Sequence, residues 1–143
     1  MTIKTIAIST LIVSSIAIAP AFAGGNTANV VQNGWLNNIA GGQAGDYGHM
    51  ELHQWGIGNS IFATQDGSNN VTAIGQTGVN NTVDSHQDGA FNMNAVAQIG
   101  TDNYADVETT GFANSNVVMQ LGDGNSASTS VNGVGNSSVI VQY

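Results

Sequence analysis

The chain has 143 residues, enough for one domain, and a composition that is polar but almost uncharged, with 19 Gly and 7% charged residues. Lys4 is its only basic residue against nine acidic ones, and it contains no Cys. A basic groove for nucleic acid and any thiolate or disulfide chemistry are therefore excluded. Disordered chains are poor in apolar residues, and at 41% hydrophobic this one does not fit that class.

Residues 1–23 have the three parts of a secretory signal peptide. Lys4 gives a basic start, an apolar run follows, and Ala21 and Ala23 place small residues at a cleavage site. The apolar run is too short to cross a bilayer as a helix, although a membrane-anchoring helix is the alternative interpretation. We expect cleavage after Ala23, export of the chain, and no membrane span in residues 24–143.

From residue 26 onward the sequence is one repeat with a period of 11. Each unit reads Asn-x-h-x-h-x-Gln followed by x-Gly-x-x, where h is often apolar. Gly keeps its place in ten consecutive units, whereas Gly48 replaces one Asn, and Thr109 and Val131 replace two Gln. The recurring amides are Gln32, Gln43, Gln54, Gln65, Gln76, Gln87, Gln98, Gln120 and Gln142, with Asn26, Asn37, Asn59, Asn70, Asn81, Asn92, Asn103, Asn114, Asn125 and Asn136.

The first seven residues of each unit have the period-two pattern of a β-strand. In residues 59–65, Asn59, Ile61, Ala63 and Gln65 face one way and the residues between them face the other. The four-residue linker contains a Gly, which reaches positive φ without steric cost and so supplies a bend. Two strands and two bends then make one flat coil of 22 residues.

Such coils predict an all-β fold, a β-solenoid in which strand-turn-strand coils form two stacked parallel sheets. One sheet contains the strands that start at 26, 48, 70, 92, 114 and 136, and the other those that start at 37, 59, 81, 103 and 125. Inside, the bulky columns of the two sheets should face each other, as should the small or polar columns. The predicted repeat domain, 24–143, has five 22-residue repeats and a final half repeat, 136–143.

Buried amides need hydrogen-bond partners, and identical amides stacked about 4.8 Å apart can supply them to one another as a ladder. The recurring Asn and Gln residues are therefore the predicted self-assembly ladder. One Gln column is unbroken, whereas the other stops at Gln87 and should be less tightly specified beyond it. The unit 136–142 keeps the repeat pattern, and the one Pro, Pro20, lies outside the repeats. Uncapped strand edges favour pairing with another copy, so we expect a homopolymer.

The pattern Gln-x-Gly-x-x-Asn-x-x-x-x-x-Gln, repeated in 22-residue pairs after a signal peptide and ending Gln-Tyr, resembles the curlin repeat of bacterial curli fibre subunits. It extends from Asn26 to Tyr143. The resemblance implies an extracellular amyloid fibre on the bacterial cell surface for adhesion and biofilm matrix, exported through a dedicated secretion channel and nucleated by a paralogue. Two departures are the absence of a targeting segment before Asn26 and of a basic last repeat, and the second favours the fibre-forming subunit over the nucleating one.

Two groups of ionisable residues suggest other roles. His49, Glu51 and His53 have metal-ligand side chains, but on a strand the two His lie about 13 Å apart, too far to share one ion, so we expect a solvated strand face. Acidic residues recur at equivalent positions of consecutive coils, where like charges repel. They serve either solubility or gatekeeping against premature assembly, and gatekeeping predicts faster fibre growth at pH 4 than at pH 7. The candidate gatekeepers are Asp66, Asp84, Asp88 and Asp106.

The repeats contain no insertion and no nucleophile or phosphate-binding motif, so we expect neither an enzyme nor a cofactor. A monomeric β-solenoid that binds a ligand or a surface is the alternative function, although it would favour outward rows of one residue type and the rows here are mixed. Aromatic residues near the bends either pack locally or bind surfaces and other matrix polymers. They are Trp35, Tyr47, Trp55, Phe91 and Phe112.

Overall fold

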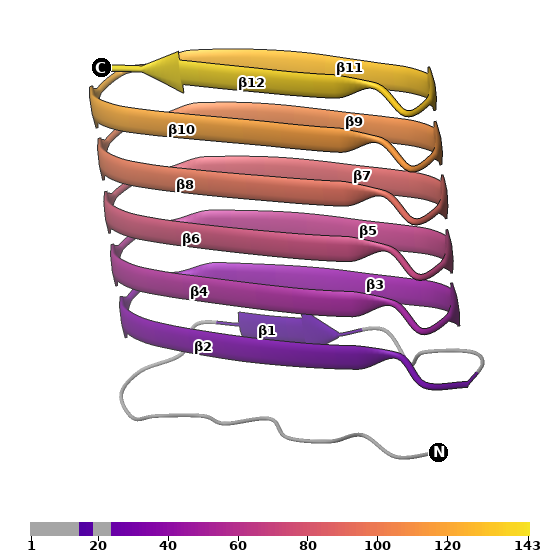
Figure 1. Cartoon of the computed structure of the whole chain (residues 1–143). Helices are drawn as coiled ribbons and strands as arrows, with labels where there is room; N and C mark the ends of the chain where they lie inside the picture. Colours follow the sequence, from indigo (N-terminus) through magenta and orange to yellow (C-terminus); the bar gives the residue numbers. More distant parts are fainter. Residues whose placement is uncertain (1–14, 19–23) are drawn as a thin grey trace.

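The computed structural model describes residues 15–18 and 24–143, and every regular element among them is a β-strand. The strands wind into a β-solenoid of two stacked parallel sheets (Figure 1), which confirms the predicted fold class. The odd sheet has the order β1-β3-β5-β7-β9-β11, and the even sheet has the order β2-β4-β6-β8-β10-β12.

The twelve strands follow one another with a short bend between each pair in the repeats. Their bounds are Ser15–Ile18 (β1), Thr27–Trp35 (β2), Asn38–Asp46 (β3), His49–Ile57 (β4), Ser60–Ser68 (β5), Val71–Val79 (β6), Thr82–Ala90 (β7), Met93–Thr101 (β8), Tyr104–Phe112 (β9), Ser115–Asp123 (β10), Ser126–Val134 (β11) and Ser137–Gln142 (β12).

Every pairing from β2 to β12 is parallel, with partner residues 22 positions apart. Gln54, for example, pairs with Gln32 on one side and with Gln76 on the other. Each position of the repeat therefore stacks on its own equivalent in the next coil, as the 11-residue period predicts.

The full-length repeat strands have nine residues rather than the predicted seven, because the ladder continues past the Gly. Gly34 has a φ of 121°, and a Cβ at that position would collide with the carbonyl oxygen of Gly56 in the next coil. The recurring Gly thus permits close stacking at positive φ, and it lies inside the strand. The turn itself falls two residues later.

The residue just before the repeat Asn is left-handed throughout, although its type varies. Leu36 has a φ of 58°, Tyr47 of 57° and Phe91 of 59°. Left-handed backbone is unfavourable for residues with a Cβ, so the closure of the bend imposes this conformation against local preference. The repeat pattern does not predict this conformation. The other left-handed residues of the bends are Gly58, Asn69, Asn80, Asp102, Ala113, Gly124 and Gly135.

The core lies between the two sheets and consists of the predicted inward columns. Small or polar residues face each other across it, as Asn94 donates to Ser85 (3.1 Å), and the hydroxyls of Thr129 and Ser138 lie 3.1 Å apart. Met50 fills the space that Gly41 leaves opposite it. The bulky columns supply most of the buried apolar cluster: Val30, Leu52, Ile74, Val96 and Val118 from one sheet, and Ile39, Ile61, Val83, Ala105 and Ala127 from the other.

β1 gives the odd sheet one more strand than the sequence analysis predicts. It pairs with the outer edge of β3, from Ser15 against Asn38 to Ile18 against Gly41. These four residues belong to the predicted signal peptide, the rest of which lies outside the described residues. No helix long and apolar enough to cross a membrane occurs in the part of the chain that the structure describes.

Candidate assembly site: amide columns and strand edges

The Gln residues of the even sheet form one continuous hydrogen-bonded column. In each step the side-chain amide nitrogen of one coil donates to the side-chain carbonyl of the next, so all the bonds point toward the C-terminus. The distances are 3.2 Å from Gln32 to Gln54, 2.8 Å from Gln54 to Gln76, 2.8 Å from Gln76 to Gln98, 2.7 Å from Gln98 to Gln120, and 2.8 Å from Gln120 to Gln142.

Each central Gln also connects the two sheets, which the sequence analysis missed. Gln76 donates its second amide hydrogen to the main-chain carbonyl of Ser60 in the odd sheet, and Gln98 does the same to Thr82, both at 3.1 Å. Because both amide hydrogens and the carbonyl are used, these fully buried side chains carry no desolvation penalty for unmet hydrogen bonds.

The Gln column of the odd sheet is shorter. Gln43 donates to Gln65 (2.8 Å) and Gln65 to Gln87 (3.0 Å), and the next position is Thr109, whose hydroxyl donates to the Asn94 carbonyl (2.6 Å). The following coil has Val131 at this position, with no hydroxyl to donate. Asn116 is the equivalent of Asn94 in this coil, and the carbonyl oxygen of its buried side chain has no hydrogen-bond partner.

The repeat Asn residues mainly satisfy the backbone of the bends. Asn59 donates to the main-chain carbonyls of Trp55 (3.2 Å) and Gly78 (3.0 Å), and its own side-chain carbonyl accepts from the main-chain N–H of Asn81 (3.0 Å). The predicted amide-to-amide contact occurs for only some of them. The direct Asn–Asn bonds run from Asn81 to Asn59, from Asn103 to Asn81, and from Asn114 to Asn92.

The two ends of the solenoid carry complementary side-chain groups. At the N-terminal end, the buried carbonyl oxygen of Gln32 has no hydrogen-bond partner. At the C-terminal end, the Gln142 amide donates to Ser126 (2.9 Å), and the hydrogen that other Gln residues give to the next coil has no Gln to meet. The side-chain carbonyls of Asn103 and Asn114 accept from the main-chain N–H of Asn125 and Asn136 in the next coil, and the structure describes no further coil that could donate to Asn125 and Asn136 in the same way.

The main chain at the C-terminal end is equally unpaired. Within the solenoid, Tyr104 and Ser115 donate their main-chain N–H to the carbonyls of Asn125 and Asn136 in the next coil, both at 2.8 Å. The equivalent residues of β11 and β12, Ser126 and Ser137, have no further strand beside them among the described residues. The edges of β11 and β12 are thus open to another strand.

The candidate gatekeepers stack as the sequence predicts. Asp84 pairs with Asp106, and Asp66 pairs with Asp88. Partial burial raises the pKa of Asp84 above its ordinary value, and the Asp106 carboxylate raises it further, while His86 lowers it. Protonation of Asp84 therefore removes a repulsion between successive coils of the odd sheet.

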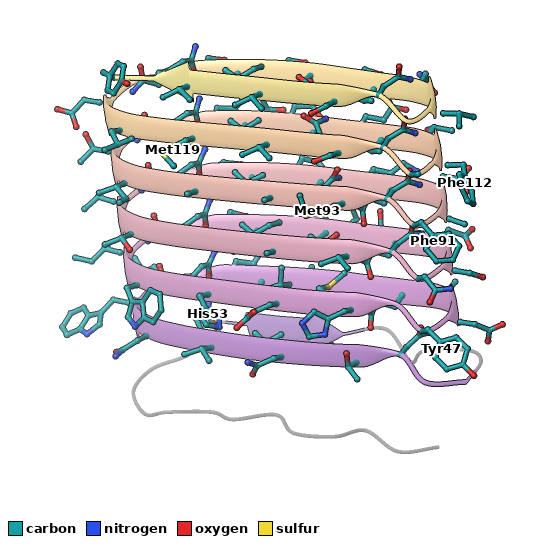
Figure 2. The ribbon with its side chains drawn as sticks, viewed as in Figure 1. Tyr47, His53, Phe91, Met93, Phe112 and Met119 are labelled. Carbon is teal, nitrogen blue, oxygen red and sulfur yellow. The ribbon has the colours of Figure 1, made fainter. Side chains whose placement is uncertain are left out.

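The remaining candidate residues belong to the outward positions of the strands and to the bends, and Figure 2 shows Tyr47, His53, Phe91 and Phe112 among them. His49 bonds to the Thr27 hydroxyl (2.7 Å) and the His53 ring lies 3.2 Å from Glu51, and no group of three potential ligands for a metal ion occurs among the described residues. Phe91 and Phe112 pack edge to face across adjacent coils, with ring centroids 5.3 Å apart. Trp35, Tyr47 and Trp55 are also exposed.

No protein-family model matches the chain, and the search of curated proteins gave no match. The fold, the amide columns and the open edges therefore define the class of protein by structure alone: a β-solenoid of 22-residue coils whose two ends are sheet edges.

Proposed function

We propose that the chain is a secreted structural subunit whose copies add end to end into a cross-β fibre. The observation that carries this proposal is the pair of open strand edges on β11 and β12, beside which the Gln142 amide has no Gln of a further coil to donate to. A second copy supplies a partner strand for each edge and a side-chain carbonyl for the Gln142 amide, because interior coils already make the same kinds of bond.

The expected gain in free energy is large enough to drive addition. A nine-residue parallel strand such as β11 gains hydrogen bonds that contribute about 0.5 to 1.5 kcal/mol each, which gives several kcal/mol for one edge. Burial of Ile140, which is only partly covered in the last coil, adds to this gain. The loss of translational and rotational freedom of each added copy opposes this gain.

The biological setting of the proposal comes from the resemblance to curlin repeats. A curli-like fibre on the bacterial cell surface would serve adhesion and the biofilm matrix, with a nucleating paralogue and a dedicated secretion channel as partners. The absence of Lys and Arg from residues 24–143 agrees with a role that involves no nucleic acid. The outward rows mix residue types, whereas the alternative, a monomeric ligand-binding solenoid, would favour rows of one type.

Proline at the open edge tests the proposal. The double variant Ser126→Pro/Ser137→Pro removes two main-chain N–H groups at the open edges of β11 and β12, where an incoming copy would accept from them as the next coil accepts from Tyr104 and Ser115. Both sites are the first residue of an edge strand, where Pro is tolerated, so the isolated chain should still fold. We expect the variant to form no fibres alone and, at a few per cent of the total, to slow seeded growth of the parent chain.

The matched control is Ser126→Ala/Ser137→Ala, which keeps both N–H groups and should grow like the parent chain. A further comparison is Ser115→Pro, which removes an interior bond to Asn136 and should destabilise the folded chain itself. Fibre growth by the double Pro variant at the rate of its Ala control would overturn the proposal, as would a parent chain that stays monomeric at high micromolar concentration.

A further inference from the structure

The two sheets do not have the same number of repeat strands. Without β1, which lies in the predicted signal peptide, the odd sheet has five strands and the even sheet has six (Figure 1). The repeat therefore starts in the even sheet with β2 and also ends there with β12. A second copy placed on the end without rotation would continue one sheet but skip a strand position in the other.

We infer that successive copies in the fibre are related by half a turn about the fibre axis, so that β2 of the incoming copy pairs with β11 and its β3 pairs with β12. This inference rests on the proposed end-to-end assembly and on removal of residues 1–23. It specifies the register as Thr27 on Ser126 in one sheet and Asn38 on Ser137 in the other.

The period of the sequence makes this rotation possible. One 11-residue unit advances the chain by one strand and moves it to the opposite sheet, so the two sheets are built from equivalent units. A half turn carries an even strand into an odd position and reverses its direction in the same operation. The incoming β2 therefore runs parallel to β11, as every repeat pairing inside the molecule does.

The main-chain pairing differs greatly between the two arrangements. With the half turn, all nine residues of β11 and all six of β12 gain a partner strand. Without it, only β12 is paired, and β11 faces the incoming β3 across an empty strand position about 10 Å wide, twice the spacing of paired strands. The unpaired edge would leave inward residues such as Ala127 and Thr129 beside a gap.

The two arrangements also differ in which side chains find hydrogen-bond partners at the joint between copies. With the half turn, the carbonyls of Asn125 and Asn136 both receive the main-chain N–H of a repeat Asn, and the Gln142 amide meets Gln43. The cost is that Gln32 then lies over Val131 and keeps its carbonyl without a donor. Without rotation, Gln142 meets Gln32, but the Asn125 carbonyl gains nothing. One unmet carbonyl weighs less than a nine-residue ladder, so the half turn is favoured.

Paired cysteines distinguish the arrangements, since the natural chain has no Cys. Asn29→Cys combined with Ser128→Cys places two outward thiols at opposite ends of one molecule, and they meet across the joint only after a half turn. Asn29→Cys combined with Val139→Cys is the matched variant, whose thiols meet only without rotation. In paired strands the Cα atoms lie about 4.8 Å apart, within the range that a disulfide spans.

Each variant of residues 24–143 is grown on seeds of the parent chain, oxidised, dissolved in denaturant and examined for covalent oligomers on a non-reducing gel. We expect an oligomer ladder from Asn29→Cys/Ser128→Cys and at least tenfold less from Asn29→Cys/Val139→Cys, while Asn29→Cys alone controls for contacts between fibres. Fibres in which the Val139 variant cross-links, or in which neither does, would overturn the half turn and leave the proposed function intact. Absence of fibres from the parent chain would overturn both.

Discussion

The hydroxyl of Thr109 donates a 2.6 Å hydrogen bond to the side-chain carbonyl of Asn94, 15 residues earlier and on the opposite sheet. Both side chains are fully buried. One coil further on, the equivalent pair is Val131 and Asn116, and there the carbonyl has no partner. The chain thus makes the same contact once and omits it once, which isolates the energetic contribution of a single hydroxyl.

Val131→Thr should therefore stabilise the folded chain by about 1 kcal/mol. Thr keeps one of the two Val methyl groups and replaces the other with a hydroxyl, which can donate to the Asn116 carbonyl, and a buried carbonyl without a donor costs about 1 to 3 kcal/mol. The midpoint of urea unfolding measures the effect. Val134→Thr makes the same exchange at an exposed position of the same strand and should change the midpoint little. A lower midpoint for Val131→Thr would show that Asn116 has found another partner.

The exposed Leu36, in a left-handed bend, offers a second test. Left-handed backbone costs a residue with a side chain about 1 to 2 kcal/mol. Gly avoids this cost but loses more backbone entropy on folding, which destabilises the folded state by about 0.5 to 1 kcal/mol. Leu36→Gly should thus raise the free energy of unfolding by about 0.5 to 1 kcal/mol. Leu36→Ala keeps a Cβ, and with it the strain, so it should give no such gain. Equal stability of the two variants would contradict a left-handed Leu36.

The acidic column predicts a pH dependence with a definite sign. The pKa of Asp84 is raised above 3.8 in the folded chain, so the folded state binds this proton more tightly than the unfolded chain does. The resulting stabilisation is present below pH 3.8 and is lost as the pH rises through the raised pKa. Asp84→Asn should therefore be more stable than the parent chain at pH 7 and nearly equal to it at pH 3.

Denaturant midpoints at the two pH values measure this difference, and the lag time of fibre formation tests the gatekeeping hypothesis beside it. Asp102→Asn makes the same change of charge in a bend whose equivalents one coil away are Asn80 and Gly124, and so serves as the control. We expect a shorter lag at pH 4 than at pH 7 for the parent chain and a smaller difference for Asp84→Asn. Equal lag times at both pH values would reject gatekeeping.

The pairing of β1 with β3 predicts that residues 1–23 hinder assembly. β1 occupies the outer edge of β3, which is the edge that β12 of another copy needs in the proposed fibre. The chain 1–143 should extend seeds more slowly than the chain 24–143. Ala17→Pro in the longer chain removes a main-chain N–H from β1 and should restore part of the rate. Equal rates for the long and short chains would show that β1 leaves the edge without cost.

The periodic part of the fold follows closely from the sequence, and the exceptions have physical causes. Ile61 and Gln65 face inward as the period-two pattern predicts, because position in the repeat fixes position across the sheet. The left-handed Leu36 and Tyr47 could not be predicted, because residue type varies at this position and only closure of the bend sets φ.

The candidate site was predictable in composition but not in all its bonds. The Gln columns follow from equal spacing along the chain, whereas the bond from Gln76 to Ser60 depends on the stagger between the two sheets, which no repeat pattern encodes. The Asn side chains were expected to bond mainly to each other, yet Asn59 mainly serves the main chain of the bends, because its short side chain reaches those carbonyls. β1 has no repeat pattern at all.

X-ray diffraction from aligned assemblies of residues 24–143 tests the central claim most directly. Strands stacked along the fibre axis should give a sharp meridional reflection at about 4.7 to 4.8 Å and an equatorial reflection near 10 Å from the two sheets. Assemblies without the meridional reflection, or with it on the equator, would contradict a fibre made by end-to-end continuation of the solenoid.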